Sequence, residues 1–353
     1  MKNKFKIQSF YIFLFFLFFI PNSNGNESFV FDVTEIEITE NGNKFIGKNG
    51  GTVKTDNGVT IFAENFIYDK VKNILYANTN VKIDDKIKNI IILSDKITYL
   101  KNKEIIFSEN RSKAESDGLT IIAEKFNYNK NLNTFNAKGN VEIVDEINNY
   151  SGFGKDITYF KNDEKILTIG KTTANLKSKY KFSGRDITIL RNKSELKSSF
   201  KASIEDLNFT EYEFENFIYY FKDEFLKAKN VSIISNNKLN EGETDRAKFL
   251  DGFFDLKNKN YNASNTSIKI KKNSFDNTKN DPRIAGVSSK SKNNITSIEK
   301  AVFTSCEISN EKCPPWSIKA EKITHDKNKR QLIYDKAILQ VYDKPIMYFP
   351  KFF

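Results

Sequence analysis

The chain has 353 residues, 29% of them charged and 14% aromatic, with a formal net charge of +11 and only two cysteines and one histidine. Its lysines are scattered among asparagine, isoleucine, phenylalanine and interleaved acids instead of forming a basic stripe, which argues against a nucleic-acid partner. Two cysteines and one histidine are too few good ligands for a zinc site. No metal or other cofactor is therefore expected.

The first 25 residues have the pattern of a secretion signal. Lysines at positions 2, 4 and 6 precede an apolar run from Phe10 to Ile20, and small residues lie just before Asn26. This run is shorter than the roughly 20 residues that a membrane-spanning helix needs, and the small residues suit a cleavage site. The mature chain is expected to be exported, and a retained membrane anchor is the competing interpretation.

The sequence repeats itself at an offset of 60 residues. Residues 58–85 and 118–145 are identical at 14 of 28 positions without a gap, and the same register relates 97–104 to 157–164. Repetition of a short unit predicts a stack of similar elements in which each element covers a face of its neighbour.

Apolar and polar residues alternate within each copy, which is typical of strands with one apolar face. Lys82, for example, lies between Val81 and Ile83. The parity of the apolar residues changes after Ala63 and, in the second copy, after Ala123, which predicts a bulge or corner inside the strand. The residues expected to point into one continuous apolar interior are Ile61, Ala63, Leu75, Val81, Ile83, Ile121, Ala123, Phe135, Val141 and Ile143.

The remaining chain divides by composition. Residues 26–270 are expected to form β repeats without a long helix. Residues 271–298 are rich in asparagine, serine and lysine and almost free of apolar side chains, which predicts a polar linker or long exposed loop. Strand-like alternation resumes over 299–353. A degraded repeat is expected there, because Ala320, Glu321, Ile323, His325, Asp326 and Lys327 match Ala63, Glu64, Phe66, Tyr68, Asp69 and Lys70.

Cys306 and Cys313 are separated by six residues. In an oxidising compartment the two can form a disulfide across this short loop, and one or both can instead pair with a cysteine on another segment. The nearby Trp316 is expected to be an anchoring aromatic of the core.

Two sets of residues resemble the LptD (OstA) family of lipopolysaccharide-assembly proteins. The segments 303–306, 313–321 and 344–350 are similar to the junction between the periplasmic domain and the outer-membrane barrel of that family. The pattern Ala-Glu-x-Φ-x-Tyr at 63–68 and 123–128, followed by Ala-x-x-Asn-Val-x-Ile at 77–83 and 137–143, resembles the repeat that this family shares with the soluble bridge protein LptA.

The resemblance implies an all-β fold: a repeat-built β-jellyroll, shaped like an OstA/LptA-like folded sheet that is open along one side, with no transmembrane barrel in this chain. Its ligand would be lipopolysaccharide, whose acyl chains the apolar interior would shield. Each methylene shielded from water is worth about 0.8 kcal/mol. The protein would act at the periplasmic face of the outer membrane.

Partners are also implied by the resemblance. An LptA-like bridge protein would add a strand to the N-terminal edge, within about residues 29–65, by backbone hydrogen bonding. The C-terminal end would meet an LptE-like outer-membrane lipoprotein and the barrel, and Cys306 matches the family cysteine that bonds the barrel. Since this chain ends at Phe353, before any barrel, a fragment, a split gene or a truncated product is expected.

Two other functions remain open: a soluble LptA-like bridge protein, and a structural or adhesive β-repeat protein at the cell surface with no lipid ligand. An interior lined by leucine, isoleucine, phenylalanine and valine without a polar plug would favour transport. No enzyme is expected, because no nucleophile elbow, P-loop or dinucleotide-binding motif occurs. The sole histidine, His325, replaces a repeat tyrosine, which favours a packing role over catalysis.

Overall fold

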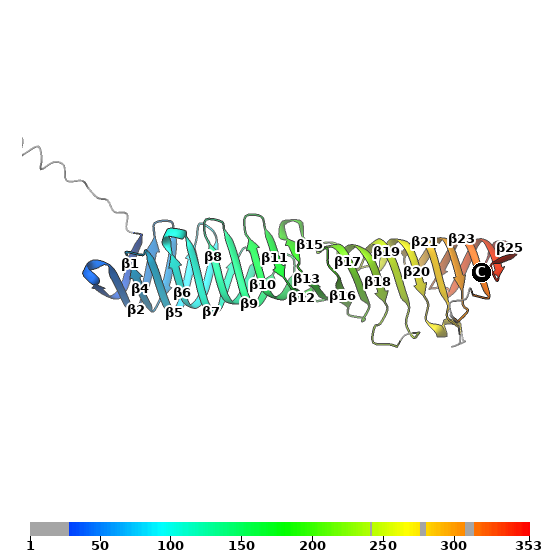
Figure 1. Cartoon of the computed structure of the whole chain (residues 1–353), viewed down its shortest axis with the longest axis horizontal. Coiled ribbons are helices and arrows are strands. Elements are labelled where there is room, and N and C mark those ends of the chain that lie inside the picture. Colours follow the sequence, from blue (N-terminus) through cyan, green and yellow to red (C-terminus); the bar gives the residue numbers. More distant parts are fainter. Residues whose placement is uncertain (1–27, 241, 276–279, 308–313) are drawn as a thin grey trace, which may run out of the picture.

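The computed structural model describes residues 28–240, 242–275, 280–307 and 314–353, so the expected signal segment lies outside the described residues. Within these ranges the chain is all-β, with twenty-five strands joined in one sheet and four short 3₁₀ turns. Figure 1 shows a long, narrow stack of strands, with the N-terminal strands at one end and the C-terminal strands at the other. The predicted fold class, an all-β folded sheet built from repeats, is confirmed.

The strands in the N-terminal half are β1 Phe29–Thr39, β2 Lys44–Thr55, β3 Val59–Ala63, β4 Asn65–Asp69, β5 Ile74–Asp85, β6 Ile90–Leu100, β7 Ile105–Ser116, β8 Leu119–Asn129, β9 Thr134–Asp145, β10 Tyr150–Phe160, β11 Lys165–Ile169 and β12 Lys171–Leu176. Those that follow are β13 Tyr180–Arg185, β14 Thr188–Leu190, β15 Glu195–Ser198, β16 Ala202–Asp206, β17 Glu211–Tyr220, β18 Phe225–Ile234, β19 Arg246–Asp255, β20 Asn260–Lys269, β21 Arg283–Lys292, β22 Ile295–Thr304, β23 Trp316–Asp326, β24 Gln331–Val341 and β25 Lys344–Phe352. The 3₁₀ turns are η1 Glu40–Gly42, η2 Lys101–Lys103, η3 Arg191–Lys193 and η4 Lys272–Phe275.

Most long strands are bent near the middle. The pairing of β8 with β9 shifts register between Ile122 and Lys125, and β5 shifts against β6 between Asn78 and Val81. Asn80 and Asn140 have positive φ values at these bends, a conformation that asparagine tolerates better than most residues. The first repeat goes further and divides into β3 and β4, which both pair with β5. The predicted corner within the strand is therefore confirmed.

The bent sheet buries one face along its length. Apolar side chains from both halves of each strand form one cluster that extends from Phe29 to Ala263, and a second cluster extends from Ile270 to Ala337. Each half of the folded sheet covers the apolar face of the other half. Strands with a single apolar face are thereby able to bury it. Among the described residues, none belongs to a helix of sufficient length and apolar character to span a bilayer.

The expectation of a linker over 271–298 is wrong from Arg283 onwards. β21 covers Arg283–Lys292 and pairs with β20 and β22, and β22 begins at Ile295. The alternation was hidden because the inward positions hold hydroxyl side chains: Ser289, Ser291 and Thr296 are buried. Hydroxyls are not counted as apolar, so the period-two signal of a strand was lost.

Candidate functional site

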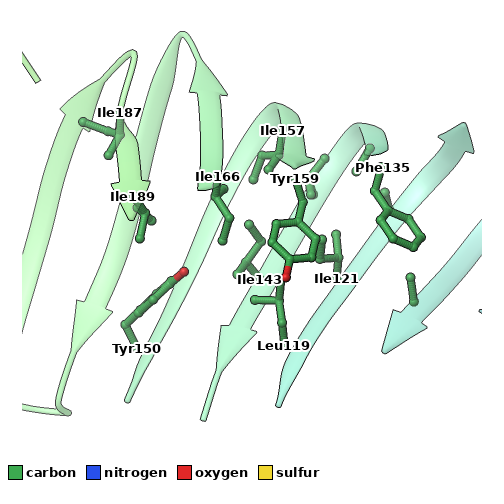
Figure 2. Packing of buried hydrophobic residues seen from close by; sticks show 14 of the residues in the cluster. Leu119, Ile121, Phe135, Ile143, Tyr150, Ile157, Tyr159, Ile166, Ile187 and Ile189 are labelled. Carbon is green, nitrogen blue, oxygen red and sulfur yellow. The ribbon is translucent and has the colours of Figure 1, made fainter. Parts of the chain in front are cut away.

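All ten residues that the sequence places in an apolar interior are buried in the N-terminal cluster, and none is exposed by more than 7%. Pairing aligns them across strands: Ile61 lies opposite Ile83, and Ile121 lies opposite Ile143. Figure 2 shows Ile121, Ile143 and Phe135 among the packed side chains of this interior. The ten residues thus share one interior, and their contact with lipid stays a prediction.

A column of tyrosines alternates with Leu75 and Phe135 in this interior, and the sequence analysis did not place these tyrosines among the interior residues. Tyr68, Tyr99, Tyr128 and Tyr159 occupy equivalent positions in β4, β6, β8 and β10, and Tyr128 stacks on Phe135 with ring centroids 4.4 Å apart. Each hydroxyl bonds the side chain five residues later: Asn73 at 3.0 Å, Glu104 at 2.5 Å, Asn133 at 3.5 Å and Glu164 at 3.1 Å. Burial holds the pKa of Tyr99, Tyr128 and Tyr159 well above its ordinary value. These rings remain uncharged and apolar towards the interior.

Two rows of turns face each other along the long edge of the folded sheet. We call this edge the lip. The first row comprises the turns after β4, β6, β8, β10, β14, β17, β19, β21 and β23, and the second row those after β2, β5, β7, β9, β12, β16 and β18. Neighbouring turns of the first row are joined by backbone bonds, as from Lys130 N to Glu104 O at 2.9 Å and from Arg191 N to Glu164 O at 2.8 Å. Backbone bonds therefore hold most neighbouring turns of the first row together.

Ion pairs connect the two rows across the lip. They join Lys101 to Asp56 at 2.7 Å, Lys130 to Asp85 at 2.7 Å, Lys161 to Asp117, Arg191 to Asp145 at 2.8 Å, Lys179 to Glu224 at 3.2 Å, Lys259 to Asp206 at 3.4 Å and Lys327 to Asp245 at 3.0 Å. We call this series the ion-pair ladder. In the pair of Lys179 with Glu224 the acid belongs to the first row, so the polarity is reversed there.

The pair of Arg191 and Asp145 is the most deeply buried, with side chains 2% and 0% exposed. Arg191 also donates to the hydroxyl of Tyr159 at 3.2 Å, to the carbonyl of Asp117 at 2.9 Å and to Glu164. Asp145 accepts from the backbone of Asn148 at 3.1 Å. Such a pair is tolerated in a low-dielectric interior only because its hydrogen-bonding capacity is satisfied.

The ion pairs lower the pKa values of several acids in the ladder. The hydrogen bond from Lys101 lowers the pKa of Asp56. Burial tends to raise the pKa of Asp117, but the hydrogen bond from Lys161 outweighs it and the pKa is lowered. Asp245 behaves likewise, since the charge of Lys327 overcomes burial and lowers its pKa. These carboxylates are therefore ionised, and able to pair with the cations opposite them, at neutral pH.

The ladder corrects the expectation of a sheet open along one side, because charged side chains bridge that side in this structure. The sequence analysis missed it, although a signal was present. A basic residue stands two positions after the repeat tyrosine at Lys101, Lys130 and Lys161. An acid stands two positions after the inward isoleucine at Asp85 and Asp145.

The C-terminal residues singled out in the sequence have structural positions. Trp316 packs beside Phe303 with ring centroids 6.0 Å apart, as an aromatic of the second cluster. Cys306 is half-buried, and its carbonyl accepts from Arg283 at 2.6 Å. Cys313 lies outside the described residues, so its predicted pairing with Cys306 stays a prediction. In the described ranges no group of three or more histidine, cysteine or acidic side chains could hold a metal ion.

Both ends of the sheet present an edge strand. In the described part of the chain β1 pairs only with β2, and β25 only with β24. β1 contains neither proline nor lysine and exposes Val30, Ile36 and Ile38. β1 also carries the acids Asp32, Glu35 and Glu37 and a register shift between Val33 and Glu35. Charged side chains and bulges are among the features by which natural edge strands hinder pairing with another chain. β1 is therefore an edge strand with partial protection.

Comparisons with known proteins add little beyond this geometry. The chain matches no protein-family model and no curated protein. Among solved structures it is similar to LptH from Pseudomonas aeruginosa, described as the LptA-homologous periplasmic component of the conserved lipopolysaccharide transport device. The identity is 13% and the TM-score 0.31, over 33% of this chain and 93% of that chain. Function is therefore argued from the site itself.

Proposed function

We propose that this protein is a periplasmic part of the lipopolysaccharide-assembly machinery, which shields lipid acyl chains inside its folded sheet and passes them towards the outer membrane. The observation that carries the proposal is the apolar interior that extends as one cluster from Phe29 to Ala263 beneath a charged lip. A lipid needs both features, because its tails avoid water and its head does not. The proposal assigns no catalytic step to the chain.

The interior is filled by its own side chains when the lip is closed, so transport requires the two halves of the sheet to separate. An acyl chain would then replace side-chain contacts with its own. Each methylene contributes about 0.8 kcal/mol on leaving water. Because the same column of residues recurs from strand to strand, the lipid would meet similar binding energy at each step. No position along the path would hold it strongly, and directed transport would need energy from elsewhere.

The ends of the sheet fit a chain of partners. An LptA-like bridge protein would pair with β1 by backbone hydrogen bonds, as the free side of an edge strand permits. The C-terminal end would lie towards an outer-membrane barrel and an LptE-like lipoprotein, as the motif resemblance implies. The secretion-signal pattern of residues 1–25 supports export, which a position at the periplasmic face of the outer membrane requires.

A site-specific photo-crosslinker tests the proposal. We expect a crosslinker at Ile121 or Val141 to capture lipopolysaccharide in cells that contain the complete transporter, because both side chains point into the interior and are at most 2% exposed. Matched controls at Lys138 and Glu142, on the outward face of the same strand β9, should capture none. Captured lipid only from the outward positions, or from none of the four in a folded protein, would contradict the proposal.

The soluble bridge protein and the surface β-repeat protein remain alternatives. A bridge would give the same crosslinks but would bind partners of similar fold at both ends, whereas a surface protein would give no lipid crosslink. The hydroxyl side chains Ser289, Ser291 and Thr296 interrupt the apolar interior between β20 and β23. The first cluster alone is long enough to include all ten predicted lipid-facing residues.

A further inference from the structure

A cavity of about 300 Å³ lies where the two apolar clusters meet. Phe249, Phe254 and Leu256 of the first cluster form part of its wall, and Ile270 of the second cluster forms another part. Protein interiors are packed densely enough that voids larger than a water molecule are few. A cavity of this size at the end of a well-packed cluster calls for a physical cause.

The cause is a change of side chain in the tyrosine column. Strand pairing continues the column from Phe254 through Tyr261 to Ser291, Thr296 and His325. Ser291 and Thr296 bond each other at 3.0 Å, and both line the cavity. Two small hydroxyl residues occupy positions where earlier strands carry tyrosine, leucine or isoleucine. The space that large side chains fill elsewhere is left open here.

The lip above the cavity lacks one ion pair of the ladder. We call each ion pair of the ladder a rung. The first-row turn at Asn293 and Asn294 makes no ion pair among the described residues, and Asn294 instead bonds Asn328 of its own row and lines the cavity. The flanking rungs are the pairs of Lys259 with Asp206 and of Lys327 with Asp245. Among the described residues, two first-row turns make no ion pair across the lip, the turn after β4 at the N-terminal end and the turn at Asn293 and Asn294. The cavity opens beneath the second of these turns.

The flanking pair of Lys327 and Asp245 is also more exposed to solvent than the pairs nearer the N-terminus. Lys327 and Asp245 are 48% and 27% exposed, whereas Lys130 and Asp85 are 7% and 1% exposed. Exposed pairs contribute little to stability, while breaking one partner of a buried pair is costly. Separation of the two rows should therefore cost less at the cavity than at the buried pairs.

We propose that this cavity is a side port, through which one acyl chain of an anionic amphipathic lipid enters or leaves the interior. Aromatic side chains would hold the chain, and Lys259 and Lys327, released from Asp206 and Asp245 when the two flanking ion pairs open, would face the head group. The inference deepens the proposed function and rests on it for the presence of acyl chains in the interior.

A reversible cross-link across the port tests the inference. In a full chain that carries Cys306→Ser and Cys313→Ser, cysteines replace Ser235 and Asn294, which line the cavity from the two opposite rows. A reducible bis-maleimide joins them, and a photoreactive fatty acid serves as the probe. We expect the probe to label peptides from β19 and β20 in the open protein, to lose this labelling when the port is linked, and to regain it after reduction.

The matched control places the same cross-link across a rung that is already closed, with Asp117→Cys and Lys161→Cys in the same background. Labelling of β19 and β20 should be unchanged. A further variant, Ser291→Leu with Thr296→Leu, refills the column and should lose the labelling while it retains the folded sheet by circular dichroism. Labelling that persists in the linked or refilled protein, or that the control cross-link abolishes equally, would overturn the port.

Different experimental results would refute the port and the proposed function. Lipopolysaccharide captured at Ile121 in cells, whether or not the port is linked, would leave transport standing and remove the port. Capture at Ile121 that disappears only when the port is linked would support both. If neither the fatty acid nor lipopolysaccharide labels any inward position of the folded protein, the proposed function fails and the port fails with it.

Discussion

Neutralising Asp145 tests how firmly the ion-pair ladder closes the lip. Asp145→Asn keeps the size of the side chain and its bonds from the backbone of residues 147 and 148, but it removes the charge that faces Arg191 at 2.8 Å. Removal of one partner from a buried pair costs about 3–5 kcal/mol, because the remaining charge is left uncompensated. Glu164 still contacts Arg191. We therefore expect the lower end of this range, about 3 kcal/mol.

The assay must report locally, because an extended array of strands need not unfold in one step. We would measure amide hydrogen exchange of β9, β10 and the 191–194 turn together with unfolding in urea. The matched control is Glu321→Ala, which breaks an exposed pair between Glu321 and Lys336, 58% and 65% exposed. Such an exposed pair is screened by solvent and contributes little to stability. Equal costs for the two variants would refute a closing role for the buried rung.

Three further predictions concern other regions. Burial and the charge of Lys327 lower the pKa of His325, so the unfolded chain binds a proton more readily and the free energy of unfolding falls as the pH drops below about 6.5. Urea unfolding at pH 8 and pH 5 should therefore show a smaller loss of stability for His325→Gln than for the wild type. An equal loss in the two proteins would contradict this. Proline at alternate positions of Val33–Ile38 should weaken binding of a bridge protein to the folded chain, and undiminished binding would argue against β1 as the docking edge. Non-reducing mass mapping should find Cys306 bonded to Cys313 or free in this chain; Cys306 bonded to a cysteine of another protein would contradict this local pairing.

The folded sheet could be predicted from the sequence because its determinants are local. The side-chain parity on each side of Ala123 is fixed by neighbours within one strand, and the register shift between Ile122 and Lys125 follows from it. The repeat then extends the same rule to the next copy. The burial of all ten predicted interior residues has the same origin.

The lip could not be predicted in the same way because its contacts are not local. Lys130 and Asp85 are 45 residues apart and meet only when the sheet has bent and both rows of turns have aligned. The cavity was missed for a different reason. Ser291 and Thr296 look like loop residues by composition, and only the pairing of β21 with β22 places them in the tyrosine column.

The ladder and the interior together suggest why a transport path would be built with charged rungs. Exchange of side-chain contacts for acyl-chain contacts is nearly balanced, because both bury apolar surface at a similar free energy per unit area. A balanced exchange provides no force that closes the sheet after a lipid has passed. Ion pairs provide one, since their attraction acts only when the rows are close and weakens once water separates them. Rungs buried as deeply as Arg191 and Asp145 would restore the closed state, and a missing rung at Asn293 and Asn294 would leave one place where it opens more readily.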